Sequence, residues 1–361
     1  MTRNKQKRSD IRDFVIFNVE KHRKDIGKLL AEKFGISRVT AVKHLQALID
    51  EGILEAEGKT RNRIYLLKEL INRIWRFDVS PDLHEDIVWR EHIKPALVGT
   101  NENVMAICAH GLTEMLNNVV SHSESPVAIL HVVKNAARIL MYVNDEGVGI
   151  FRKIQTKFNL ADPQHALLEL AKGKLTTDEK HHAGEGIFFT CRMFDEFMIS
   201  SDAIDFCRFT SNDTWFFEDR KEPVKGTRVM MKISVYAKQT VREIFDTYRA
   251  EFDTYGFSKT IIPLVLMQYE GEQLISRSQA KRLLSRADRF KEVFLDFKGI
   301  TAIGQAFADE VFRVYPAEHP GVSLNYIHAS DEILNMIRRV QGGREDQPLL
   351  FNADNERSNL D

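Results

Sequence analysis

Polar residues recur at intervals of four on one segment of this chain, and a glycine motif follows one strand later. Glu114, Asn118 and His122 would lie on nearly the same face of an α-helix, because four residues make slightly more than one turn. The apolar run 136–143 indicates a buried strand, and the Asp-x-Gly-x-Gly sequence of 145–149 then lets the backbone turn tightly. The two patterns together predict one wall of a nucleotide site.

Residues 114–149 resemble the GHKL ATP-binding fold, which is shared by gyrase B, histidine kinases and the mismatch-repair ATPases. The resemblance continues with a second glycine sequence at 182–188 and with a Gly-Thr strand at 225–232. Each motif alone is also found as a solvated helix face, a turn or a cation loop. The order of all four over about 120 residues makes the similarity specific.

This resemblance implies a role for each matching position. Glu114 would be the general base toward an attacking water or hydroxyl, and Asn118 would bind Mg²⁺ through its amide oxygen. Asp145 would accept from the adenine amino group of ATP, with Thr227 in support. His122 is either a ligand contact or an ordinary group at a helix end. The remaining contacts would be made by the backbone of Gly147, Gly149, Gly184 and Gly186.

The resemblance also implies a lid over the phosphates between the two glycine sequences, at residues 151–183. Lys172 and Lys174 are cations of that segment, and we expect Lys174 to contact the nucleotide. His181 and His182 lack a Cys or carboxylate at metal-ligand spacing, so we assign them to the lid.

The front of the chain is basic. Residues 1–66 carry 15 Lys and Arg against 9 Asp and Glu, whereas the whole chain has a net charge of −1. This asymmetry favours a separate basic module that binds an acidic partner.

Within this module, Gly35 supplies a turn and Ser37 can cap a following helix. The expected elements are helices at 11–20, 26–34 and 39–50 and hairpin strands at 53–58 and 64–67. This order, and the segment 37–48 in particular, resembles the winged helix-turn-helix of bacterial transcription regulators. We assign residues 1–67 to it.

The winged helix-turn-helix resemblance implies contacts to double-stranded DNA from the third helix and the wing. The expected DNA-binding residues are Arg38, Thr40, Lys43, His44, Arg61 and Arg63. The alternative is a winged helix used for protein contacts.

Residues 68–100 connect this module to the GHKL part, which we place at 101–238. A helix is expected at 82–93, and Pro81 and Pro95 limit its length. Trp75 and Trp89 require burial, so we expect an ordered bridge.

Beyond residue 238, strands and helices alternate, which favours an open α/β sheet. The strand-loop-helix 294–307 resembles the STAS fold of anti-sigma-factor antagonists, and we assign 240–340 to a STAS-like domain. In phosphorylatable STAS proteins an acidic residue and a serine begin the helix. Those places fall here on Gly304 and Gln305. Glutamine has no hydroxyl to phosphorylate, so the family's serine switch is not expected here, and Thr301 is expected to be structural.

Residues 341–361 are polar and are expected to form a disordered tail. The chain shows neither a long apolar run nor a signal-peptide core, so we expect a cytoplasmic protein with no membrane contact. Its three cysteines are scattered, which fits a reducing compartment and core packing.

These patterns predict a multi-domain α+β protein with a winged helix, a GHKL α/β sandwich whose mixed sheet is covered by helices, and a small STAS-like α/β domain. Two functions follow. In the first, Mg-ATP binding or hydrolysis switches a bacterial transcription regulator that binds DNA. In the second, the chain is a serine/threonine protein kinase of the anti-sigma-factor type. A regulatory protein bound through the STAS-like domain and a homodimer are compatible with both. We favour the regulator, because a DNA-binding module and a STAS-like domain without its serine share one chain.

Overall fold

The computed structural model describes residues 3–59, 62–160, 162–175, 184–248, 257–268 and 273–342, and it is a mixed α/β structure with several sheets. The chain divides into two compact units. The first comprises Met1–Glu146, Phe194–Phe197 and Arg228–Thr240, and the second comprises Gly147–Met193, Met198–Thr227 and Val241–Asp361. Within the described residues, no helix has the length and apolar character needed to cross a membrane.

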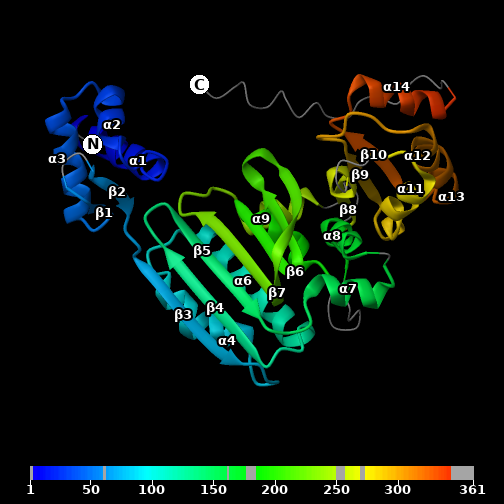
Figure 1. The fold of residues 1–361 in the computed structure, drawn as a ribbon, viewed down its shortest axis with the longest axis horizontal. Helices are drawn as coiled ribbons and strands as arrows, with labels where there is room; N and C mark the ends of the chain where they lie inside the picture. The colour runs from blue at the N-terminus through cyan, green and yellow to red at the C-terminus, as the bar shows by residue number, and fades with distance from the viewer. Residues whose placement is uncertain are drawn as a thin grey trace. The chain divides into compact units, whose positions relative to one another are not determined.

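The first unit begins with three helices and a hairpin (Figure 1). The elements are α1 (Arg3–Asn18), α2 (Ile26–Phe34), α3 (Arg38–Asp50), β1 (Leu54–Glu57) and β2 (Ile64–Leu67). Gly35 ends α2 with a φ of 60°, and the Ser37 hydroxyl caps α3 by accepting from the N–H of Thr40 at 3.1 Å. Val15, Leu30 and Leu45 lie in the common core. The expected helices and antiparallel hairpin are therefore present, and α1 starts earlier than expected.

A five-stranded sheet follows, in the order β3-β4-β5-β7-β6. Its strands are β3 (Ile71–Asp78), β4 (Val127–Lys134), β5 (Arg138–Asp145), β6 (Glu196–Phe209) and β7 (Thr214–Ser234). The pairs β3–β4, β4–β5 and β5–β7 are antiparallel, where the sequence predicted a mixed sheet. Strand β3 lies in the segment expected to be a bridge, and it pairs with β4 along its whole length.

The rest of that bridging segment forms short helical pieces. They are α4 (Glu85–Val88), the π-helical turn η2 (Trp89–Ile93) and α5 (Lys94–Ala96), which has a proline in its first turn. Val88 and Ile93 are buried, whereas Trp75 and Trp89 are half-buried. The segment is therefore ordered, as expected.

Helix α6 (Glu102–His122) packs against β5 and β7 of this sheet (Figure 1). The contact is closest at Gly111, where an added Cβ would lie 2.5 Å from the ring of Phe194 and 3.0 Å from Sδ of Met231. Such distances are shorter than van der Waals contact, so a side chain at position 111 would push α6 away from the sheet.

Two contacts join the N-terminal helices to the sheet inside the first unit. Glu20, which follows α1, forms an ion pair with Arg138 at the start of β5. The rings of Phe17 and Tyr236 lie 5.0 Å apart between centroids. The N-terminal module therefore touches the sheet directly, as well as through the chain.

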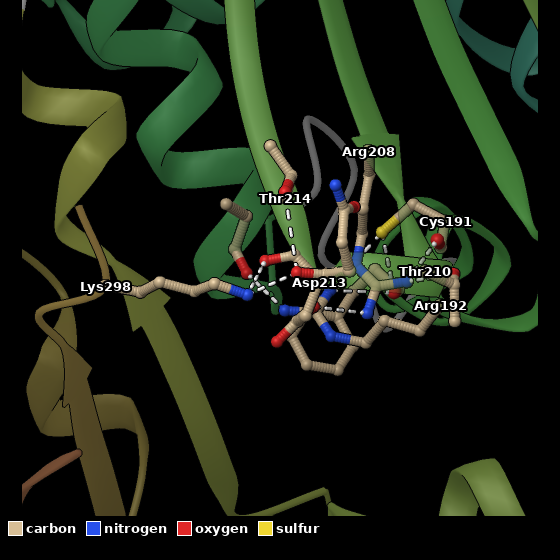
Figure 2. A network of polar contacts seen from close by, with 10 residues as sticks. Cys191, Arg192, Arg208, Thr210, Asp213, Thr214 and Lys298 are labelled. Carbon is tan, nitrogen blue, oxygen red and sulfur yellow. Dashed lines mark hydrogen bonds and ion pairs between the residues drawn. The ribbon is translucent and has the colours of Figure 1, made fainter. Parts of the chain in front are cut away.

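The second unit contains α7 (Ile150–Phe158), α8 (Pro163–Lys172), α9 (Gly186–Met193) and α10 (Val241–Thr247). Two buried arginines lie beside the connection between β6 and β7, which includes the turn η3 (Thr210–Asn212) (Figure 2). The guanidinium of Arg192 stacks 3.5 Å from the centroid of Phe188, and Arg208 donates to Asp213 Oδ1 at 2.9 Å. Lys298 donates to the carbonyl of Asn212.

The C-terminal part of the second unit is a parallel sheet in the order β10-β9-β8 with helices around it. Its strands are β8 (Lys259–Pro263), β9 (Glu292–Asp296) and β10 (Ser323–Ile327). Its helical elements are η4 (Leu264–Met267), α11 (Arg277–Leu284), η5 (Ala287–Arg289), α12 (Gln305–Asp309), η6 (Glu310–Val314), α13 (Tyr315–Glu318) and α14 (Asp331–Val340). The expected open α/β sheet is confirmed. The predicted tail lies outside the described residues from position 343 onward.

Candidate functional site

The polar row on α6 lies beside the buried face of that helix. Glu114, Asn118 and His122 are all half-buried, and each four-residue step turns by about 40°, so the three side chains span roughly 80° of the helix. Met115 and Leu116, next to Glu114 in sequence, are buried. The sequence therefore predicted correctly that these three groups share one flank of a helix that packs on the sheet.

Two serine hydroxyls fasten the end of α6 to the end of β5. Ser123 Oγ donates to the carbonyl of Val119 at 2.6 Å and accepts from the N–H of Ser125 at 3.0 Å. Ser125 Oγ then accepts from the N–H of Glu146 at 3.0 Å. Asp145, just before Glu146, is buried. The helix that carries Glu114 and Asn118 and the strand that ends in Asp145 are thus held together, and the sequence motifs did not include either serine.

In the second unit, the first glycine sequence is tied to the Gly-Thr segment. The Ile150 N–H donates to Thr227 Oγ1 at 3.1 Å, and Ser201 Oγ donates to the carbonyl of Gly226 at 2.8 Å. Gly149 has a φ of 79°, and an added Cβ would lie 2.7 Å from Ser201 Oγ. Glycine is required at position 149 for both reasons. Gly147, which is half-buried, shows no such left-handed conformation.

The backbone of Gly184, in the second glycine sequence, is hydrogen-bonded to the backbone of Leu175. The Leu175 N–H donates to the carbonyl of Gly184 at 3.1 Å, and an added Cβ on Gly184 would come within 2.5 Å of the Leu175 backbone. Helix α9 begins at Gly186, so this glycine sequence stands at a helix N-terminus as expected. Burial raises the pKa of Glu185, which lies between the two glycines. Residues 176–183, including His181 and His182, lie outside the described residues.

The two lysines expected in the lid bind the C-terminal part of the second unit. Lys172 is 1% exposed, and its ammonium donates to Glu169 Oε1 at 2.6 Å and to the carbonyl of Ser285 at 2.8 Å. Lys174 donates to the carbonyl of Arg289 at 2.8 Å and lies 4.8 Å from the ring centroid of Phe290. Lys174, the expected nucleotide contact, is therefore directed at the segment before β9.

Further polar contacts join α8 to the same part of the second unit. The Thr260 hydroxyl donates to the carbonyl of Lys172 at 2.7 Å, and Arg286 lies 3.5 Å from Glu169. Burial acts to raise the pKa of Glu169, but Lys172 and His165 lower it by more, so the pKa is below its ordinary value. The carboxylate is ionised and its charge is compensated inside the protein.

The predicted DNA-binding residues lie on more than one side of α3. Arg38 and Lys43 are exposed, whereas Thr40 and His44 are half-buried. Thr40 takes part in the cap at Ser37, and burial, followed by the charges of Arg8 and Lys7, lowers the pKa of His44. Arg61 lies outside the described residues.

The exposed face of α3 contains further residues that the sequence prediction did not include. Val39, Val42 and Gln46 are exposed on the side of the helix that carries Lys43. Gln46 accepts from Arg63 Nη2 at 3.3 Å, which places the half-buried Arg63 of the hairpin beside this face. Their spacing of three to four residues, opposite the buried Ala41, Leu45 and Leu48, was the available signal.

The position that holds the acidic residue in phosphorylatable STAS proteins, Gly304, is closed in this chain. Gly304 precedes α12, and its N–H donates to the carbonyl of Leu274 at 2.8 Å. An added Cβ at Gly304 would lie 2.7 Å from Cα of Ile275. A side chain at position 304 would therefore displace the backbone of the preceding segment.

Residues 279–334 match the family described as "STAS-like domain of unknown function (DUF4325)". The matched segment contains β9 and β10 and runs from α11 into α14. The C-terminal part of the chain is therefore STAS-like. No curated protein matches the chain.

Proposed function

We propose that this chain is an ATP-dependent regulator in which a GHKL-type site switches the state of a winged-helix DNA-binding module and of the STAS-like part. The observation that carries the proposal is the hydrogen bond between Ser125 and Glu146. It holds the helix with Glu114 and Asn118 beside the strand that ends in Asp145. A base, an amide oxygen and a buried carboxylate are thereby collected in one unit, as ATP chemistry requires.

The donor types fit ATP and Mg²⁺. Asn118 offers an amide oxygen, which is a ligand that Mg²⁺ accepts, and the ion would reduce the charge on the phosphate oxygens when bound. Glu114 would orient water by accepting its proton, and buried Asp145 would accept from the adenine amino group.

Contacts within the second unit support the proposed switch. The segment that runs into Gly184 carries Lys172 and Lys174, and both ammonium groups are held by the backbone just before β9. If nucleotide draws Lys174 toward the phosphates, its bond to Arg289 must break. ATP then shifts the equilibrium between the conformation in which Lys174 bonds to Arg289 and the conformation in which it does not, because ATP binds the two with different affinities.

The N-terminal module is the part of the chain that, in this proposal, binds DNA in response to the nucleotide. Exposed Arg38 and Lys43 on α3 and the hairpin residue Arg63 supply cationic groups for phosphates and base edges. The ion pair of Glu20 with Arg138 connects this module to β5, the strand that ends in Asp145. A structural change at Asp145 would therefore be transmitted along β5 to Arg138, and from there through the ion pair to the N-terminal module.

The proposal is tested by the fate of γ-labelled ATP with Mg²⁺. Release of free phosphate by the parent, and loss of release in Glu114→Ala with nucleotide binding retained, is the expected result. Label transferred to a serine or threonine of an added STAS protein would instead make the kinase the better function. Absence of both release and transfer would contradict an ATP-consuming role.

A further inference from the structure

A buried carboxylate and a half-exposed imidazole meet at the carboxyl edge of the STAS-like sheet. Asp296 is the last residue of β9, and His328 follows the last residue of the neighbouring parallel strand β10. The distance from His328 Nδ1 to Asp296 Oδ1 is 2.7 Å. The Asp296 side chain is 4% exposed, whereas that of His328 is 46% exposed. In open α/β sheets, this edge is where ligands usually bind.

The hydrogen bonds fix which ring nitrogen of His328 is available. The same Asp296 oxygen also accepts from the Lys298 N–H at 2.9 Å. When Asp296 is ionised it only accepts hydrogen bonds, and Nδ1 of His328 then carries the proton that the two groups share. Nδ1 is thus engaged by Asp296, which leaves Nε2 as the ring nitrogen available to a ligand, and no other described residue bonds to this ring.

The backbone of His328 has a positive φ, which indicates that the surrounding structure holds the ring in this position. Its φ is 55°, in the left-handed region, which is uncommon for residues other than glycine, although histidine adopts it more often than most of them. Unfavoured backbone conformations persist where the surrounding structure enforces them, and such places are frequently functional sites. The pair His22–Asp25 lacks these features, because its carboxylate is 58% exposed and His22 does not have a positive φ.

We propose that Nε2 of His328 is a phosphoryl acceptor, so that the STAS-like part carries its modification on this histidine. The choice of ATP as donor rests on the proposed function. The Nε2 lone pair attacks the γ-phosphorus, the N–P bond forms, and the bond from phosphorus to the bridging oxygen breaks with its electron pair leaving on ADP. The resulting cationic ring passes its Nδ1 proton to Asp296 or to water, which leaves a neutral phosphoimidazole.

The modification would act on a loop that already makes contacts elsewhere in the second unit. A phosphoryl group adds about 1.5 to 2 negative charges at neutral pH, beside the buried carboxylate of Asp296. The resulting repulsion weakens the bond that also orients the Lys298 backbone. The ammonium of Lys298 binds the carbonyl of Asn212 (Figure 2), so a shift of this loop is passed to the connection between β6 and β7.

The matched variant is His328→Asn. Asparagine tolerates a positive φ, and its Nδ2 can donate to Asp296 as Nδ1 does, but it has no nucleophilic nitrogen. The control is His319→Asn, in the same part of the chain, where the ring bonds the carbonyl of Tyr315 and stacks on its side chain. Circular dichroism and thermal midpoints check that both variants fold like the parent.

The full chain is treated separately with γ-labelled Mg-ATP and with phosphoramidate, a small phosphoryl donor that does not need the ATP site. We expect acid-labile, base-stable label from both donors, on the peptide that contains His328, with at least a tenfold loss in His328→Asn and none in His319→Asn. Mass spectrometry of the intact peptide locates the group.

The two proposals fail differently. Phosphate release from ATP with no label on His328 from either donor would overturn the acceptor and leave the proposed function standing. Label on His328 from phosphoramidate, with neither transfer nor hydrolysis of ATP, would support the acceptor and overturn the proposed function. Acid-stable label on a serine or threonine alone would also overturn the acceptor.

Discussion

The Ser125 hydroxyl accepts a hydrogen bond from the Glu146 N–H at 3.0 Å, and the same hydroxyl accepts from the N–H of Val127 at 3.2 Å and donates to its carbonyl at 2.7 Å. One buried side chain thus joins the residues after α6, the start of β4 and the loop that follows Asp145. This arrangement places the helix with the proposed base next to the strand with the proposed adenine acceptor.

Ser125→Ala removes this junction and leaves two backbone N–H groups without their acceptor. We expect a loss of unfolding free energy of about 1–3 kcal/mol and weaker ATP binding, because the loop after Asp145 loses its anchor. Urea denaturation and a calorimetric titration measure the two effects. The control is Ser121→Ala on α6, where the exposed hydroxyl donates to Asn117 and, among the described residues, to no other group. If the two variants have the same unfolding free energy and the same affinity for ATP, the role given to Ser125 is wrong.

Glu169→Gln should destabilise the second unit, because it leaves the buried ammonium of Lys172 without its carboxylate. Removal of one partner from a buried ion pair typically costs about 3–5 kcal/mol. The double variant Glu169→Gln, Lys172→Met removes the uncompensated charge and should recover at least half of the loss. Denaturant midpoints of the three proteins give the comparison. A single variant as stable as the parent would show that the pair does not hold α8.

The stability of the first unit should fall in mild acid because of His110. Burial lowers the pKa of its imidazole from the ordinary 6.5 to about 4. Below pH 6.5 the unfolded chain binds a proton that the folded chain refuses, so stability is complete above this pH and declines down to about pH 4. The full effect is on the order of 3 kcal/mol.

His110→Gln should flatten this dependence. Thermal midpoints between about pH 7 and about pH 5 provide the test. If the thermal midpoint of His110→Gln falls with pH as steeply as that of the parent, another group causes the acid sensitivity.

Lys43→Ala should weaken binding to double-stranded DNA if the exposed face of α3 meets the duplex. Loss of one phosphate contact is expected to reduce affinity by about tenfold and to lower the slope of log affinity against log salt by about 0.9. Fluorescence anisotropy with a random-sequence duplex measures both. Lys28→Ala is the control, because that exposed lysine lies on α2 and pairs with Glu32. Identical salt slopes for the three proteins would favour protein contacts for this module.

Local features of the fold were predictable from the sequence. The start of α3 follows from a serine whose hydroxyl caps the next turn, and the row of polar residues on α6 follows from helical spacing. Strand β3 was missed because Asn72, Arg73 and Arg76 interrupt the apolar alternation expected of a strand. Its assignment depends on pairing with β4, which begins 49 residues after β3 ends.

The surroundings of the site residues depend on still more distant contacts. Lys174 binds the carbonyl of a residue 115 positions away, and His328 binds Asp296 across two parallel strands. The close approach of Ile275 to Gly304 likewise results from tertiary packing. No periodicity or motif in one sequence specifies such pairs, so the sequence identified candidate groups but not their partners.

The most direct measurement is a calorimetric titration of Mg-ATP into the parent protein, Asp145→Asn and Glu114→Ala. We predict saturable binding by the parent, similar affinity for Glu114→Ala, and a loss of at least tenfold, or about 1.4 kcal/mol, for Asp145→Asn. The reason is that Asp145 is assigned to hold the adenine, whereas Glu114 is assigned to the reaction. An Asp145→Asn protein that binds ATP as tightly as the parent would contradict the nucleotide site itself.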